Sequence, residues 1–201
     1  MKISISGAIL AGGTNNRFRG ITKANVVIEG VTIISRIISV IEKFFPELII
    51  VTNRPDEFQE FSQFKITKDQ YLNAGPLAGI HAAMKASAEE AVFIFAGDMP
   101  FPDKRIIADQ IKEFNNRNCE VLIPKIGHYI ESLHAIYRKS LLNDLERFIS
   151  ERRNRAVRDF LGEVNVEYLQ LSDNKQNRRA FTNINSPSDL DNIIFKYSLP
   201  D

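Results

Sequence analysis

Short, nearly continuous apolar runs recur along the first two-thirds of the chain and alternate with longer segments whose apolar residues follow a helical spacing. The runs are Ile3–Leu10, Leu48–Thr52, Ala91–Phe95 and Glu120–Ile123. The helical segments are Thr32–Phe44, Leu77–Ala88 and Pro102–Phe114. Continuous apolar runs of this length are typical of strands buried on both faces. The pattern therefore predicts an α/β fold in which helices flank a mostly parallel central sheet.

The last third of the chain departs from this repeat. Tyr129–Tyr137 predicts an added strand that is free to run antiparallel, and Ser140–Leu161 predicts two helices. The segment Ser186-Pro187-Ser188-Asp189 has the polar cap and early proline that are typical of a helix start. Because no repeat, low-complexity tract or linker-like stretch divides the sequence, we expect one domain over residues 1–201.

The composition agrees with a single buried core, because 44% of the 201 residues are hydrophobic and 25% are charged. Lys and Arg number 26 and Asp and Glu number 25, so the formal net charge is +1. This balance favours neither a nucleic-acid backbone nor an anionic membrane as a partner, and we expect neither. A small ligand is the remaining expectation.

Cysteine usage and the N-terminal sequence point to a cytoplasmic protein. Cys119 is the one cysteine, so it cannot form an internal disulfide, and it lies beside the apolar run Val121-Leu122-Ile123. We expect a buried structural thiol there rather than a nucleophile. No basic segment with a cleavage site opens the sequence, and no apolar stretch is long enough to span a bilayer.

A loop rich in small residues follows the first strand and ends in cations. It runs from Ala11 to Lys23 and contains Gly12, Gly13 and Arg17. Glycines let backbone N–H groups approach an anion closely, and the two cations can neutralise oxygens that gain charge during a reaction. The spacing matches neither the P-loop nor Gly-x-Gly-x-x-Gly, and a plain glycine turn is the alternative. The pattern predicts a phosphate-binding loop.

Polar residues gather where three of the predicted strands end. These ends are Ala11-Gly12-Gly13, Asn53-Arg54 and Gly97-Asp98-Met99-Pro100. Ligands of open α/β sheets bind at the carboxyl ends of the strands. Asp98 follows a buried run directly and is the candidate ligand for Mg²⁺, which needs only one or two protein carboxylates beside water and phosphate oxygens. A cap for the helix near Pro102 is the alternative role of Asp98.

A second glycine turn precedes the helix at Leu77. Gly75 lets the backbone pass close to a purine ring, although an ordinary helix entry explains the turn equally well. Asp69, shortly upstream, and Asn53, at another strand end, are candidates for binding the base or the ribose. Each of these residues is also common in turns, so no single one decides the function.

Taken together, these blocks resemble the molybdenum cofactor guanylyltransferases, which have a Rossmann-like nucleotidyltransferase fold. The resemblance covers nearly the whole chain in order: Leu10-Ala11-Gly12-Gly13 with Arg17 and Lys23, Asn53, Asp69, Gly75-Pro76-Leu77-Ala78-Gly79, Gly97-Asp98-Met99-Pro100-Phe101, Leu133-His134-Ala135-Ile136-Tyr137, and Phe181-Thr182-Asn183-Ile184-Asn185-Ser186-Pro187. The glycine loop indicates a nucleotidyltransferase. The blocks around Asp98 and Asn185 indicate the molybdopterin branch.

The resemblance implies transfer of GMP from GTP to the terminal phosphate of molybdopterin, with Mg²⁺ as the cofactor and pyrophosphate as the second product. Cofactor-delivery or acceptor proteins are further candidate partners. The catalytic candidates are Arg17, Lys23 and Asp98, and Asp98 is the metal ligand. The nucleotide-binding candidates are Leu10, Ala11, Gly12, Gly13, Lys23, Asn53, Asp69, Gly75 and Asp98. The acceptor-binding candidates are Asn183 and Asn185.

Three positions depart from the pattern of the family. Arg19 stands where glycine is usual, Thr22 replaces an acidic residue before Lys23, and Ser132 replaces a proline. Two other functions stay open: a nucleotidyltransferase that uses CTP or a sugar phosphate, and a catalytically silent nucleotide-binding module. The presence of Lys23 and Asp98 speaks against the silent module.

Overall fold

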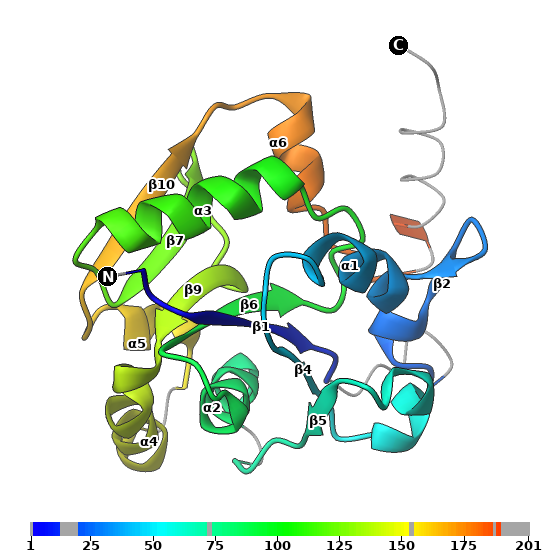
Figure 1. Ribbon diagram of the computed structural model, residues 1–201, viewed down its shortest axis with the longest axis horizontal. Coiled ribbons are helices and arrows are strands. Elements are labelled where there is room, and N and C mark those ends of the chain that lie inside the picture. The colour runs from blue at the N-terminus through cyan, green and yellow to red at the C-terminus, as the bar shows by residue number, and fades with distance from the viewer. Residues whose placement is uncertain (1, 13–19, 72–73, 153–154, 187, 190–201) are drawn as a thin grey trace.

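The computed structural model describes residues 2–12, 20–71, 74–152, 155–186 and 188–189. Within them, an eight-stranded sheet lies between helices that cover both of its faces (Figure 1). The strands of this sheet are β1 (Ile5–Leu10), β4 (Leu48–Val51), β5 (Lys65–Thr67), β6 (Ala91–Ala96), β7 (Val121–Ile126), β8 (Tyr129–Ile130), β9 (His134–Arg138) and β10 (Val166–Leu171). The short strands β2 (Val27–Ile28) and β3 (Val31–Thr32) pair with each other as a separate hairpin.

The helices vary widely in length. The α-helices are α1 (Ile33–Ile41), α2 (Pro76–Ala86), α3 (Lys104–Asn116), α4 (Leu142–Glu151), α5 (Val157–Leu161) and α6 (Lys175–Ala180). The 3-10 helices are η2 (Lys23–Asn25), η3 (Pro55–Phe61) and η4 (Lys139–Leu141). Among the described residues, no helix is long and apolar enough to cross a membrane.

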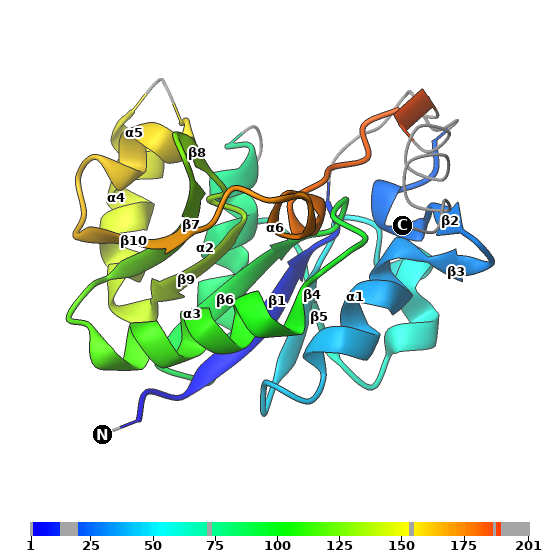
Figure 2. The same ribbon diagram turned by 90° about the horizontal axis from the view of Figure 1, so that it is seen from above.

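The sheet is mostly parallel, as the sequence predicts. Its strand order is β10-β7-β9-β6-β1-β4-β5, and β8 pairs with β7 beside this path. β1 runs parallel to β4 and β6, β4 to β5, and β10 to β7, whereas β9 runs antiparallel between β6 and β7. The carboxyl ends of β6, β1 and β4 therefore lie side by side at one edge of the sheet (Figure 2).

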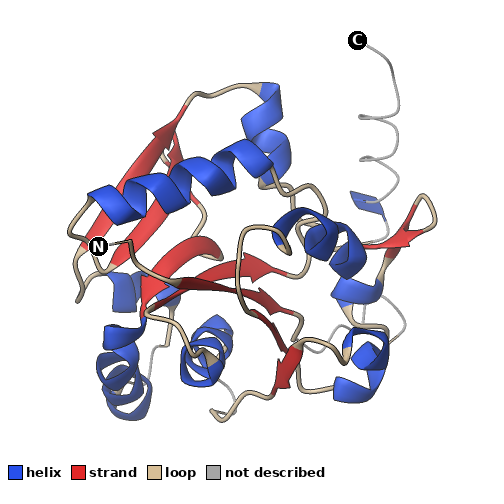
Figure 3. Cartoon of the chain, in the orientation of Figure 1, coloured by secondary structure: helices blue, strands red, loops and turns tan. Residues whose placement is uncertain are grey.

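The two faces of the sheet are covered by different helices (Figure 3). Ile9 and Phe95 belong to the cluster that contains Ile37 of α1 and other buried side chains of α1 and α3. Val92 and Ile94 belong to the cluster that includes side chains from α2 and α4. Because side chains alternate between faces along a strand, a run that is apolar at every position supplies both cores at once.

The segment predicted as one strand over Tyr129–Tyr137 is divided into β8 and β9. The Glu131 side chain accepts a hydrogen bond from the backbone N–H of Leu133 (3.0 Å), and its carbonyl accepts one from His134 (3.2 Å). These bonds close a turn between the two strands, so the prediction of a single strand is wrong. The antiparallel direction is confirmed for both pieces.

The other predictions for the last third and for the thiol can be checked directly. Helices α4 and α5 lie within the segment Ser140–Leu161, as expected. Asp189 accepts hydrogen bonds from the backbone N–H groups of Asn185 and Ser186, both 2.8 Å long, while Pro187 and everything after 189 lie outside the described residues. Cys119 is 1% exposed, which confirms that the thiol is buried, and this burial raises its pKa.

Candidate active site

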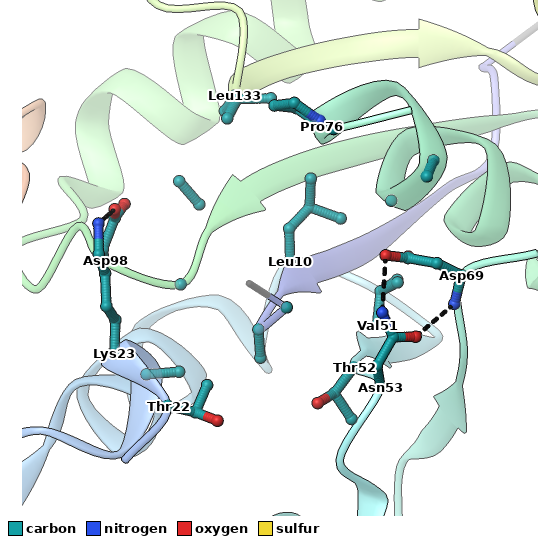
Figure 4. Close-up of a pocket in the computed structure, with 18 of the residues that line it drawn as sticks. Leu10, Thr22, Lys23, Val51, Thr52, Asn53, Asp69, Pro76, Asp98 and Leu133 are labelled. Atoms are coloured by element: carbon teal, nitrogen blue, oxygen red, sulfur yellow. Dashed lines mark hydrogen bonds and ion pairs between the residues drawn. The ribbon is translucent and has the colours of Figure 1, made fainter. Parts of the chain in front are cut away.

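The carboxyl ends of β1, β4 and β6 open onto a cavity of about 660 Å³ (Figure 4). This volume lies within the range of small-molecule sites, and the position is where open α/β sheets bind ligands. The lining residues are Leu10, Ala11, Gly12, Thr22, Lys23, Ala24, Val51, Thr52, Asn53, Arg54, Asp69, Tyr71, Gly75, Pro76, Ala78, Gly79, Ala96, Gly97, Asp98 and Leu133.

One end of the cavity carries a lysine that contacts two side-chain oxygens. The Lys23 Nζ atom, at the start of η2, lies 2.9 Å from Asp98 Oδ2 and 2.5 Å from Asn185 Oδ1. The Lys23 and Asp98 side chains are 27% and 23% exposed, so the ion pair is partly shielded from water. Three segments that are far apart in the sequence thus meet at a single ammonium group.

The backbone around Asp98 is held from two sides. The N–H of Gly97 donates to the carbonyl of Leu10 (3.0 Å), and the N–H of Ile184 donates to the carbonyl of Asp98 (2.9 Å). A Cβ atom at Gly97 would lie 2.7 Å from the Leu10 carbonyl oxygen and 3.2 Å from the Ala11 Cα atom. Position 97 therefore requires glycine, because the end of β6 approaches the end of β1 so closely.

Gly97→Ala is expected to lower the free energy of unfolding by about 1–3 kcal/mol, because the added methyl group must push the two strand ends apart. Urea denaturation of the variant and the wild type measures the difference. Gly12→Ala is the matched control, since among the described residues the nearest atom to a Cβ there would be Asp69 Oδ2 at 3.9 Å. Equal stability of the Gly97 variant and the wild type would contradict the close approach.

The opposite end of the cavity carries a paired amide and carboxylate. Asn53 Nδ2 donates to Asp69 Oδ2 (3.2 Å), and the Asp69 backbone N–H donates to Asn53 Oδ1 (3.1 Å). Burial raises the pKa of the Asp69 carboxyl, against the lowering effects of the Asn53 hydrogen bond and of His81. Among the described residues, Asp69 Oδ1 has no hydrogen-bond donor, so this carboxylate can accept bonds from a ligand.

An apolar floor separates the two polar ends. The Leu10 side chain lies between the Lys23–Asp98 pair and the Asn53–Asp69 pair (Figure 4). A Cβ atom at Gly79 of α2 would lie 3.2 Å from Leu10, so the helix packs directly against the end of β1. Gly75, just before α2, has φ +56°, a left-handed conformation that favours glycine. The cavity is therefore apolar between its two polar ends.

Most of the residues predicted from the sequence line this one cavity. They are Leu10, Ala11, Gly12, Lys23, Asn53, Asp69, Gly75 and Asp98. Asn185 joins them through Lys23, whereas Asn183 does not line the cavity, and its side-chain oxygen is buried without a hydrogen-bond partner among the described residues. The predicted residues Gly13 and Arg17, and the departure at Arg19, lie outside the described residues.

The structure adds lining residues that the sequence prediction did not include. Arg54 and Tyr71 are the polar ones with the largest side chains. Arg54 follows Asn53 directly at the end of a predicted strand, so its position in the sequence could have indicated that it lines the cavity. No feature of the sequence indicated that Tyr71 lines the cavity, because its place there depends on how the chain turns after Asp69.

The oxygens around Lys23 are compatible with a divalent metal ion. Asp98 Oδ2 and Asn185 Oδ1 both accept hydrogen bonds from the Lys23 ammonium group, and the Asp98 carboxylate is the kind of hard oxygen donor that suits Mg²⁺. In the part of the chain that the structure describes, no group of three or more His, Cys, Asp or Glu side chains is arranged to hold a metal ion. A metal bound by Asp98 would need water or ligand oxygens to complete its coordination.

Comparisons with known proteins show what the chain is similar to. The family model described as MobA-like NTP transferase domain matches residues 7–166. A probable molybdenum cofactor guanylyltransferase from Clostridium perfringens (strain SM101 / Type A) is 34% identical over 200 residues, covering 96% of this chain and 98% of the relative. A protein of the same name from Natranaerobius thermophilus is 33% identical, with 95% of each chain covered.

The arrangement of the chain in space also matches that of a solved structure. The crystal structure of molybdopterin-guanine dinucleotide biosynthesis protein A from Archaeoglobus fulgidus superposes with a TM-score of 0.78 and 27% sequence identity. The superposition covers 96% of this chain and 98% of that one. The likeness therefore extends over nearly the whole chain.

Proposed function

The chain belongs to the MobA-like NTP transferases, which are nucleotidyltransferase enzymes, and on that premise we propose that it transfers GMP from GTP to the terminal phosphate of molybdopterin. Pyrophosphate is the second product. The observation that carries the proposal is a single cavity with the Lys23–Asp98 pair at one end and the Asn53–Asp69 pair at the other. The first pair suits a triphosphate, and the second suits a base.

The carboxylate of Asp69 favours guanine over the other bases. Guanine presents two neighbouring donors, N1–H and the N2 amino group, to a carboxylate that can accept both. Adenine and cytosine each present a ring nitrogen acceptor beside their amino group, and that lone pair would face the Asp69 oxygen. A buried group left without its partner costs binding free energy, so ATP and CTP are expected to bind more weakly.

The Lys23 end of the cavity would bind the triphosphate and the metal ion. MobA-like nucleotidyltransferases generally use a divalent metal, and we assign Mg²⁺ here, with Asp98 as the protein group that would hold it. The bound ion would supply positive charge for the phosphate oxygens and the departing pyrophosphate. Lys23, and Arg17 from the loop outside the described residues, would add further positive charge at these oxygens.

The reaction needs no nucleophilic side chain from the protein. The terminal phosphate of the acceptor attacks the α-phosphorus of GTP, and the bond to pyrophosphate breaks in line with this attack. The protein orients the two reactants and offsets their charge. We assign acceptor binding to Asn183 and Asn185, because Asn185 adjoins the phosphate end and Asn183 lies two residues before it in the same segment. We also propose that residues 1–201 act as one cytoplasmic domain.

The proposal predicts strong nucleotide selectivity. In the presence of Mg²⁺, GTP is expected to bind at least about a hundredfold more tightly than ATP, CTP or UTP, because only guanine satisfies the Asp69 carboxylate. Isothermal titration calorimetry measures the four affinities, and Asp69→Asn is expected to reduce the preference. Equal affinities for GTP and ATP would contradict the proposal, and tighter binding of CTP would favour the cytidylyltransferase alternative.

A further inference from the structure

Glu57 reaches from η3 to the chain segment that carries Lys23. The Glu57 carboxylate accepts hydrogen bonds from the Thr22 backbone N–H (3.3 Å) and from Asn25 Nδ2 (3.4 Å). Asn25 Nδ2 also donates to the Glu57 carbonyl (3.2 Å). Thr22 and Asn25 flank Lys23 closely in the sequence, so this one glutamate holds the chain on both sides of the lysine.

Arg54 binds both Glu57 and the end of the glycine loop. Its Nη1 atom lies 3.0 Å from Glu57 Oε1 and donates to the carbonyl of Gly20 at 2.5 Å. Gly20 has φ +86°, so the chain turns there in a left-handed conformation just before Thr22. The guanidinium thus ties the turn and the glutamate together while it lines the nucleotide cavity.

The surroundings keep Glu57 charged. Burial alone would raise the pKa of the Glu57 carboxyl, but hydrogen bonds from Thr22 and Arg54 outweigh it and lower the pKa. Thr22 is 3% exposed, so the bond from its backbone N–H is protected from water. A charged acceptor with several donors makes stronger hydrogen bonds than a neutral one.

We propose that Glu57 and Arg54 form a latch that positions Lys23 for the triphosphate by fastening residues 20–25 to the end of β4. The latch rests on the proposed function, because it assigns these two residues to the reaction through Lys23. Neither residue is catalytic in this scheme. Since Asn53 precedes Arg54 directly, the latch also connects the base end of the cavity with its phosphate end.

Glu57→Gln tests the latch, because the substitution keeps the shape of the side chain and removes its charge. GTP affinity and kcat/KM for GTP are expected to fall about tenfold or more, since small misplacements of a positioning group are costly. Affinity for guanosine, which has no phosphate, should stay at the wild-type value. Glu60→Gln is the matched control on the same helix η3, because Glu60 is exposed and has no ion pair among the described residues.

A second measurement tests the latch in the absence of any nucleotide. Amide hydrogen exchange over residues 20–25 is expected to be faster in Glu57→Gln than in the wild type and in Glu60→Gln, because the bond to the Thr22 N–H weakens. Arg54→Gln should have the same effect, and the double variant should add little to either single one. Non-additive effects of this kind distinguish a shared latch from two separate contributions to stability.

Three results would overturn the latch. The first is unchanged exchange over residues 20–25 in Glu57→Gln. The second is wild-type use of GTP by that variant, and the third is a parallel loss of guanosine and GTP affinity. The proposed function fails differently, through a wild-type chain that binds no guanine nucleotide, and in that case the exchange measurement still decides whether the latch holds the segment.

Discussion

Asp98→Asn is expected to lower the turnover of GMP transfer at least about a hundredfold, which corresponds to roughly 2.7 kcal/mol of activation free energy. Asparagine has nearly the same size as aspartate, so the hydrogen bonds of the Gly97 and Ile184 backbone groups should remain. The variant loses the negative charge that would hold the metal ion and that pairs with Lys23 at 2.9 Å. A steady-state assay of purified protein with GTP, Mg²⁺ and molybdopterin measures the loss.

Asp109→Asn provides the control for this prediction. Asp109 is exposed on α3, so its substitution removes the same charge from the protein without touching the cavity. Thermal unfolding should show both variants folded. Near-normal transfer by the Asp98 variant would mean that Asp98 is not the metal anchor, and the assignment of this end of the cavity would then be wrong.

Lys23→Ala is expected to reduce kcat/KM for GTP by about a hundredfold or more, because the triphosphate loses the cation that faces it. Its affinity for guanosine should change little, since the Asn53–Asp69 pair at the other end of the cavity is intact. Calorimetric titration with GTP and with guanosine separates the two effects. Lys23→Arg keeps the charge and is expected to recover part of the activity.

Asn185→Ala tests the assignment of the acceptor side next to Lys23. The variant should bind GTP within about threefold of the wild type and bind molybdopterin more weakly, because a lost hydrogen bond there costs about 1–3 kcal/mol. The contact between Lys23 and Asn185 makes this comparison sensitive. Loss of GTP affinity with intact acceptor binding would reverse the division of the cavity into a nucleotide side and an acceptor side.

The inner strands could be predicted from the sequence because they are buried on both faces. β1, β4 and β6 lie in the middle of the sheet, and their residues are apolar at nearly every position. The edge strands β5 and β10 were not predicted. Side chains at the edges of the sheet are partly exposed, as the burial of Lys65–Thr67 and Val166–Leu171 shows, and so these segments lack a continuous apolar run.

Much of the candidate site followed from the same pattern. A parallel sheet brings the carboxyl ends of neighbouring strands to one edge, so Gly12, Asn53 and Asp98 could be expected from the sequence to lie near one another. Asp69 was already a candidate from its place upstream of the second glycine turn, and the family resemblance added the late asparagines Asn183 and Asn185. The arrangement of Gly13 and Arg17 stays a prediction, because both lie outside the described residues.

The fold class, the residues at the strand ends and the family could all be predicted from the sequence, because they depend on local hydrophobic pattern and on motifs along the chain. Which of these groups contact one another became known from the three-dimensional arrangement of the chain. Lys23 and Asn185 are 162 residues apart, and Thr22 and Glu57 are 35 apart, yet each pair is joined by a hydrogen bond. Such contacts depend on how separate segments pack in space, and the local pattern of residues does not encode that packing.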